Sequence, residues 1–147
     1  TIKSSQLKKI NNPNIQIKGS DKAPSAVEKA LQNIENANLS DFVSIEKKDF
    51  FQVEKETKGP LHLLTNPPYG ERLEGDMNML YQGIGDAFKQ SFPNTQAWMI
   101  SSNMEALKYV GLRPSRKIKL FNGKLESRLL LYPIYEGTKR IHKLKDD

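Results

Sequence analysis

The chain has 147 residues, enough for one domain with a buried core, and its 37% hydrophobic and 27% charged residues are ordinary for a globular protein. It has no cysteine, which excludes disulfides, thiolate zinc sites and cysteine nucleophiles, and no apolar run approaches the ~18 residues of a membrane span. The net charge of +6 suits a polyanionic partner such as a nucleic acid. We therefore expect a protein of the reducing cytoplasm that has no membrane partner.

The first half of the chain alternates short strands with one helix. Alternating apolar residues between turn formers predict strands at residues 15–17 and 42–46. Between them, apolar residues at helical spacing predict a helix over residues 24–38, with Pro24 in the first turn, where its missing N–H costs nothing. A polar stretch then leads to a third strand at residues 61–65, three of whose five residues are leucine.

The second half continues the alternation. Residues 70–78 are rich in Gly, Glu and Asp and are predicted to form a loop. A helix is predicted over residues 79–91, a fourth strand at residues 95–101, and a short helix over residues 104–110 that Gly111 ends.

The last elements form a hairpin. A strand at residues 117–121 and a returning strand at residues 124–135 flank Asn122-Gly123, the dipeptide most typical of tight hairpin turns. Strands alternating with helices indicate an α/β fold with a mostly parallel sheet, covered by helices on both faces, and a C-terminal antiparallel β-hairpin.

The most specific motif is Asn66-Pro67-Pro68-Tyr69, directly after the third strand. Prolines lack an N–H, so the backbone must leave the sheet, which places Asn66 and Tyr69 at the carboxyl end of a strand, where open α/β sheets bind ligands. A carboxamide oxygen and a strand-end carbonyl could orient the lone pair of an amine towards a sulfonium methyl, while the ring stacks on a flipped base. The tetrapeptide resembles the Asn/Asp-Pro-Pro-Tyr/Phe motif of methyltransferases that modify exocyclic amines of nucleobases. The alternative is a plain Pro-Pro turn.

Two aspartates follow the earlier strands. Asp21 comes between the first strand and a helix, where a carboxylate can accept the hydroxyls of a ribose or simply cap the helix. Asp49 could accept an adenine amino proton while Phe50 packs on the purine, or it could be a turn acid beside a core ring. With Asn66, three successive strands end in a residue that a nucleoside cofactor and a substrate amine would need.

Basic residues crowd the carboxyl-terminal third of the chain. They form either a solvated face or a phosphate-binding surface. Neither His62 nor His142 has partners at metal-ligand spacing, and we expect no metal site. Trp98 and Met99 lie in a predicted strand and are interpreted as core residues. The crowded positions are Arg113, Arg116, Lys117, Lys119, Lys124 and Arg128, followed by Lys139, Arg140, Lys143 and Lys145.

These residues together resemble the bacterial RNA guanine-N2 methyltransferases that carry a THUMP domain, a class I, S-adenosylmethionine-dependent family whose best-known member acts on large-subunit (23S) ribosomal RNA. The resemblance covers residues 15–135. It is carried by Ile17-Lys18-Gly19-Ser20-Asp21, Lys48-Asp49-Phe50, Thr65-Asn66-Pro67-Pro68-Tyr69-Gly70-Glu71-Arg72-Leu73, Gly111-Leu112-Arg113-Pro114-Ser115-Arg116-Lys117, Phe121-Asn122-Gly123, Leu125-Glu126 and Arg128.

The resemblance implies a Rossmann-like sheet of strand order 3-2-1-4-5-7-6 and a set of residue roles. Asp21 would hold the ribose of S-adenosylmethionine, Asp49 its adenine amino group, and Phe50 would flank the adenine ring. Asn66 and the Pro67 carbonyl would hold the guanine N2 amine, and Tyr69 would stack on the base. RNA contacts are expected from Arg72, Arg113, Arg116, Lys117, Lys119 and Arg128.

The chain lacks a counterpart of the family's first strand and its Gly-rich loop. We therefore expect a fragment of a longer enzyme, inactive alone, in which residues 1–14 are an interior loop or a poorly ordered start, residues 15–136 a partial catalytic domain, and residues 137–147 a charged tail. Exposed sheet edges could allow self-association. Two other functions stay open: an adenine-N6 methyltransferase of DNA or RNA, and a non-catalytic, basic RNA-binding module.

Overall fold

The structure, a computed structural model, describes residues 15–68 and 74–136 and divides into two compact units. The amino-terminal unit comprises Thr1–Val53 and the carboxyl-terminal unit comprises Glu54–Asp147. Each is described here by itself. The expectation of one partial domain over residues 15–136 stays a prediction.

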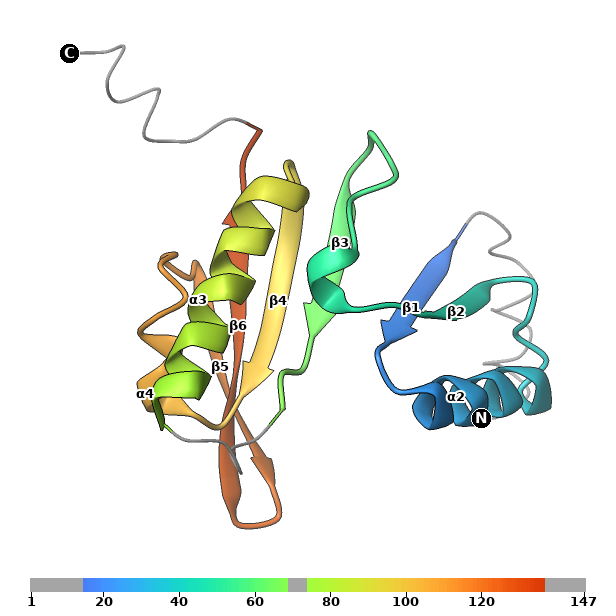
Figure 1. The fold of residues 1–147 in the computed structure, drawn as a ribbon, viewed down its shortest axis with the longest axis horizontal. Coiled ribbons are helices and arrows are strands. Elements are labelled where there is room, and N and C mark those ends of the chain that lie inside the picture. Colours follow the sequence, from blue (N-terminus) through green and yellow to red (C-terminus); the bar gives the residue numbers. More distant parts are fainter. Residues whose placement is uncertain (1–14, 69–73, 137–147) are drawn as a thin grey trace. The chain divides into compact units, whose positions relative to one another are not determined.

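The amino-terminal unit is a strand–helix–strand motif (Figure 1). Strand β1 (Ile17–Asp21) and strand β2 (Val43–Lys47) pair in parallel, from Ile17 opposite Val43 to Asp21 opposite Lys47. Helix α2 (Pro24–Asn36) contacts both strands, and a 3-10 turn, η1 (Phe50–Gln52), follows β2. No described residue of this unit is buried, so it has no core of its own.

The carboxyl-terminal unit contains a four-stranded sheet of order β3-β4-β6-β5. Strand β3 (Leu61–Thr65) is parallel to β4 (Thr95–Ser101), whereas β6 (Leu125–Ile134) runs antiparallel to both β4 and β5 (Arg116–Asn122). This order reproduces the 4-5-7-6 half of the order implied by the family resemblance. Both predicted pairing types, parallel strands and a terminal antiparallel hairpin, are confirmed.

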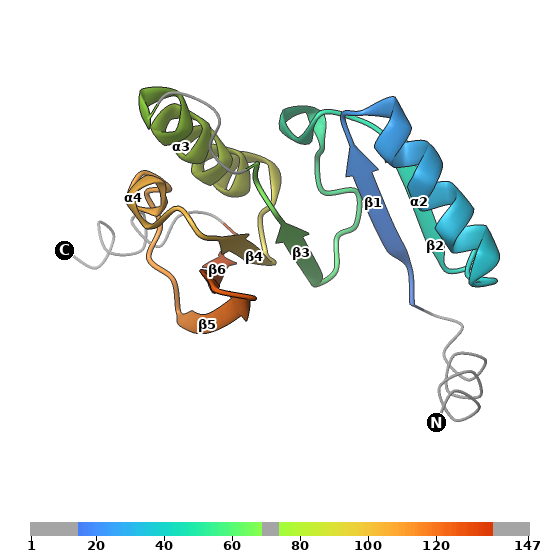
Figure 2. The ribbon, with the colours of Figure 1, turned by 90° about the horizontal axis from the view of Figure 1, so that it is seen from below.

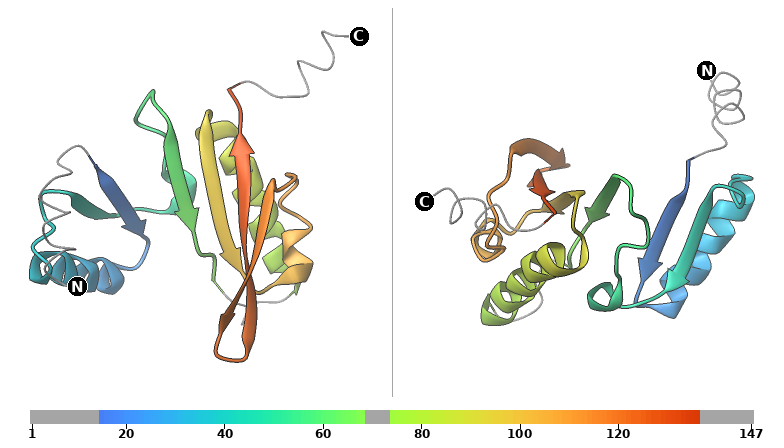
Figure 3. Two further views of the ribbon diagram at one scale, coloured as in Figure 1. Left: turned by 180° about the vertical axis from the view of Figure 1, so that it is seen from behind. Right: turned by 90° about the horizontal axis from the view of Figure 1, so that it is seen from above.

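The core lies between this sheet and two helices on one of its faces, α3 (Glu74–Ser91) and α4 (Met104–Leu107) (Figures 2 and 3). Alternate residues of β4 are buried, and the Phe88 ring of α3 lies 6.2 Å from the Tyr132 ring of β6. In the described part of this unit no helix covers the opposite face, where Leu64 is 69% exposed. The largest fully buried side chains are Tyr81, Phe88, Phe92, Met99, Val110, Thr95 and Ser101.

The predicted strands 61–65 and 95–101 are confirmed to the residue, whereas other boundaries were wrong. The first strand is Ile17–Asp21 and not residues 15–17, because Gly19-Ser20-Asp21, which resembles a turn, pairs with β2 instead. Helices α2 and α4 end two and three residues earlier than predicted, at Asn36 and Leu107.

Two further corrections concern α3 and the hairpin. Helix α3 begins at Glu74, not at residue 79, because Met77, only 2% exposed, attaches the first turn to the core. In the hairpin, Asn122 still pairs with Leu125, so the two-residue loop is Gly123-Lys124 rather than Asn122-Gly123. Gly123 has a φ of +65°, as the first loop position of a type II′ turn requires.

Candidate functional site

The Asn-Pro-Pro motif leaves the sheet where the sequence predicts. Strand β3 ends at Thr65, and the next residues are exposed Asn66, buried Pro67 and exposed Pro68. Because β3 and β4 are parallel, with Thr65 opposite Met99, Asn66 lies at the carboxyl edge that the two strands share. Tyr69 and Arg72 lie outside the described residues. Thus Asn66 and Pro67 occupy the strand end at which parallel sheets bind ligands.

The carboxyl end of β4 is held by a hydrogen-bond chain that the sequence did not reveal. The hydroxyl groups of Tyr81 and Ser101 are hydrogen-bonded in the core, and the Ser101 Oγ also accepts the Asn103 N–H at 3.0 Å. The Asn103 Oδ1 in turn accepts the Ala106 N–H at 2.9 Å and caps α4. A Ser-x-Asn sequence between a strand and a helix was the available signal. These hydrogen bonds hold the carboxyl end of β4 in place beside Asn66.

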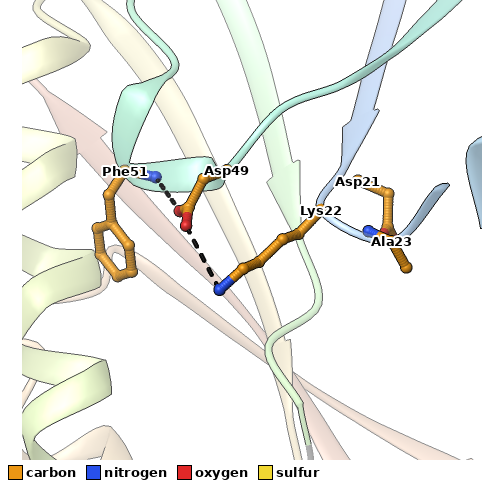
Figure 4. A network of polar contacts seen from close by, with 5 residues as sticks. All are labelled: Asp21, Lys22, Ala23, Asp49 and Phe51. Carbon is orange, nitrogen blue, oxygen red and sulfur yellow. Dashed lines mark hydrogen bonds and ion pairs between the residues drawn. The ribbon is translucent and has the colours of Figure 1, made fainter.

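Asp21 is the last residue of β1 rather than a residue beyond it. Its Oδ1 accepts the backbone N–H of Ala23 at 2.8 Å, one residue before α2 (Figure 4). The carboxylate is exposed at the strand end. The N-cap of α2 is Ala23, without a side-chain cap, so the helix-capping alternative for Asp21 is wrong, and its carboxylate stays at the edge where a ribose would bind.

Asp49 also has a local partner. Its Oδ1 accepts the Phe51 N–H at 3.0 Å and caps η1, while its Oδ2 lies 3.7 Å from the Lys22 Nζ (Figure 4). Lys22 directly follows β1, so this ion pair joins the ends of the two parallel strands. The Phe50 ring, half-buried, packs edge-on against Phe51 at 5.4 Å. The amino-terminal unit thus gathers Asp21, Asp49 and Phe50 at one edge.

This edge suits the donors of a nucleoside. The ribose hydroxyls and the adenine amine all donate hydrogen bonds, and two carboxylates from adjacent strand ends accept them. The residues present therefore fit the adenosine portion of a nucleoside cofactor. The described residues contain no group of three His, Cys, Asp or Glu side chains that could hold a metal ion.

The predicted basic residues within the described part of the chain are exposed or half-exposed but do not share one face. Lys139, Arg140, Lys143 and Lys145 lie outside the described residues. Lys119 lies opposite Arg128 across the hairpin, and both approach Glu126, at 3.5 and 3.8 Å. Arg116 lies on the other face, with its guanidinium 6.0 Å from the Trp98 ring centre. Met99 is fully buried as expected, whereas Trp98 is only half-buried, because adjacent strand residues point to opposite faces. Arg113 and Lys117 are exposed.

Comparison with known families decides the identity of the fold. Residues 2–130 match the family described as "RMKL-like, methyltransferase domain". The chain belongs to this family. A relative from Cellvibrio japonicus, named ribosomal RNA large subunit methyltransferase K/L, is 35% identical over 133 residues, which are 87% of this chain and 17% of the relative.

Solved structures agree with the RMKL-like assignment. A candidate methyltransferase, SMU.472, in complex with SAH, is 27% identical and superposes with a TM-score of 0.70, covering 83% of this chain and 32% of that one. A predicted N6-adenine-specific DNA methylase from Listeria monocytogenes is 26% identical, with a TM-score of 0.66 over 80% of this chain and 30% of that one. The α/β fold is therefore that of class I methyltransferases. No described helix is both long and apolar enough to cross a membrane.

Proposed function

We propose that this RMKL-like chain takes part in S-adenosylmethionine-dependent methylation of the N2 amine of a guanine in large-subunit ribosomal RNA. The observation that carries the proposal is the position of Asn66 and Pro67 at the carboxyl end of β3. The name of the Cellvibrio japonicus relative supports ribosomal RNA as the substrate. The enzyme would act in the cytoplasm.

The cofactor-binding roles follow from the amino-terminal unit. Asp21 accepts the ribose hydroxyls, Asp49 accepts the adenine amino proton, and Phe50 flanks the adenine. The SAH complex of SMU.472 supports this cofactor class. When bound, S-adenosylmethionine supplies an electrophilic methyl group on sulfur. Both carboxylates already accept backbone N–H groups in fixed positions, so their orientation is set before a ligand arrives.

The substrate roles belong to the strand end after β3. The Asn66 carboxamide oxygen and the Pro67 carbonyl accept the two N–H groups of the guanine amine, which turns its lone pair out of conjugation and towards the methyl group. Methyl transfer would form the N–C bond as the S–C bond breaks and its electron pair returns to sulfur; both oxygens would stabilise the positive charge that grows on nitrogen until a proton leaves it. Tyr69 stacks on the base, and Arg72 and the basic residues of the hairpin hold phosphates.

Replacing Asn66 tests this assignment in the full-length enzyme, which is the full chain of every experiment described below. We expect Asn66→Ala to lower methyl transfer to ribosomal RNA by at least ~10²-fold, because a positioned transition-state acceptor is lost, while RNA affinity changes little. Asn36→Ala, at the exposed end of α2, is the matched control and should keep wild-type activity. Wild-type turnover by the Asn66→Ala variant would show that the Asn-Pro-Pro-Tyr motif is only a turn and has no role in catalysis.

Adenine N6 is the second candidate acceptor, favoured by the name of the Listeria monocytogenes structure. The same two oxygens could hold the N6 amine, because both amines are planar NH2 groups on a purine. Nucleoside analysis of labelled RNA and DNA separates the candidates. N2-methylguanine in ribosomal RNA is the expected product. N6-methyladenine as the product would overturn the guanine proposal in favour of adenine N6.

A further inference from the structure

The end of the β5–β6 hairpin extends beyond the rest of its sheet. The pairing of β6 with β4 stops at Arg128, so residues 125–127 of β6 and 120–122 of β5 form a two-stranded ribbon (Figures 1 and 3). Three large apolar side chains on this ribbon are exposed: Phe121 by 65%, Leu125 by 48% and Leu120 by 37%. Folding of the described chain therefore leaves most of Phe121 accessible to solvent.

Positive charge borders the exposed ring. In a strand, residues two apart share a face, so Lys117, Lys119 and Phe121 form one row along β5. Arg128 lies opposite Lys119, and exposed Lys124 belongs to the hairpin loop. Among the described residues of this ribbon, the acidic one is Glu126, which lies opposite Phe121 and pairs with both Lys119 and Arg128. The ring thus stands at the end of a mainly basic row.

We propose that Phe121 is a stacking platform for an unpaired base of the RNA substrate, with Lys119 and Lys124 neutralising the adjacent phosphates. The proposal rests on the proposed function in assuming an RNA substrate. Single-stranded nucleic acid is bound by aromatic faces set among cationic side chains, because every base has a π-face and every linkage carries a charge. The ladder of the ribbon and its two-residue turn hold the ring in place, so little conformational freedom is lost on binding.

A duplex does not offer the same contact. Its bases are stacked on each other, and only the phosphates and groove edges are accessible. The structure therefore assigns Phe121 to unpaired RNA and the lysines to RNA of either form. Ring replacement and charge replacement should then have separable effects.

The test is the equilibrium binding of a short, fluorescein-labelled single-stranded RNA and its matched duplex to the full chain, followed by fluorescence anisotropy over a range of salt concentrations. Phe121→Leu keeps an apolar side chain but removes the π-face. We expect it to weaken single-strand binding about tenfold or more, to leave duplex binding and the salt slope unchanged, and to keep the wild-type melting temperature, since the ring is exposed. Phe121→Trp should bind at least as well as wild type.

Two controls identify the source of any loss. Lys119→Ala should reduce the single-strand salt slope by about 0.7, the value for one phosphate contact, which Phe121→Leu should not do. Leu125→Ala removes an exposed apolar side chain from the same ribbon and should bind RNA as wild type does. Equal losses for Phe121→Ala and Leu125→Ala, with none for Phe121→Leu, would indicate a plain apolar contact rather than ring stacking and overturn the proposal.

The remaining outcomes separate this proposal from the proposed function. If the wild-type enzyme methylates RNA and Phe121→Leu binds single-stranded RNA as tightly as wild type does, the stacking role alone is overturned. Ring-dependent RNA binding by a full chain that methylates neither RNA nor DNA would overturn the proposed function alone. If the wild-type full chain binds no RNA, both are overturned.

Discussion

Gly85 of α3 faces the backbone at the end of α4 without room for a side chain. A Cβ at this position would lie 1.8 Å from the Val110 carbonyl oxygen and 2.8 Å from its carbonyl carbon. Real Cβ atoms do not approach other atoms below 3.0 Å, and backbone atoms cannot rotate away as side chains do. Val110 is only 1% exposed, so the connection after α4 is itself packed in the core. Gly85→Ala therefore requires α3 and this connection to separate.

Two effects oppose each other in Gly85→Ala. Alanine in a helix interior is favoured over glycine by about 1 kcal/mol, whereas forcing extra volume into a packed core costs about 1–3 kcal/mol, and occasionally more. A required shift of more than 1 Å on backbone atoms places the cost at the upper end of this range, so after the helix gain we expect the free energy of unfolding to fall by about 2 kcal/mol or more. Gly75→Ala, in the exposed first turn of the same helix, meets nothing within 4 Å and should gain up to about 1 kcal/mol.

The assay is urea unfolding of the full chain followed by far-ultraviolet circular dichroism. The difference in midpoint between the two variants, at a common slope, gives the difference in stability. The expected order is Gly75→Ala, wild type, Gly85→Ala, from most to least stable. A Gly85→Ala variant as stable as Gly75→Ala would refute the close approach of α3 to Val110.

Two other outcomes follow from charges and hydrogen bonds. Burial and the neighbouring Tyr81 raise the pKa of Tyr132 from 10.0 to about 12, so the stability conferred by its neutral phenol is complete below about pH 10 and is lost as the pH rises towards 12. We expect the free energy of unfolding, measured by urea titration, to fall less between about pH 8 and about pH 11 for Tyr132→Phe than for wild type. The control is Tyr109→Phe, at a residue that is 45% exposed, for which the fall should equal that of wild type. Asp49→Ala should weaken S-adenosylmethionine binding about tenfold in calorimetry of the full chain, while Asp49→Asn, which keeps an acceptor oxygen, should bind nearly as wild type; equal affinities of all three would contradict the adenine role.

Much of the chain's local structure could be predicted because its strands are bounded by residues with strong backbone preferences. Strands β3 and β4 were predicted to the residue, since Pro60 and Pro67 flank β3 closely and Asn94 and Asn103 flank β4. Prediction failed where composition resembled a turn. The Gly19-Ser20 pair continues β1 because β2 supplies its hydrogen bonds, and the first turn of α3 forms because Met77 is buried.

The candidate site was predictable in position but not in contacts. The sequence placed Asp21, Asp49 and Asn66 near strand ends, because a parallel alternation of strands and helices brings loops to the carboxyl edge. It could not show that Asp49 pairs with Lys22 at 3.7 Å, a contact between the ends of two strands separated by a whole helix. Nor could it show the Tyr81–Ser101 hydrogen bond, whose partners come from α3 and β4.

The sequence by itself determined where this chain leaves β3, because Pro67 and Pro68 have no N–H to donate to a neighbouring strand. Only the tertiary structure decided which side chains remain exposed. Strand β6 pairs with both β4 and β5, and its first three residues after the turn extend past β4, so Phe121 remains uncovered while Tyr132, on the same β5–β6 hairpin, is buried. Both are aromatic residues in strands, and only their neighbours across the ladder distinguish a core ring from a surface one.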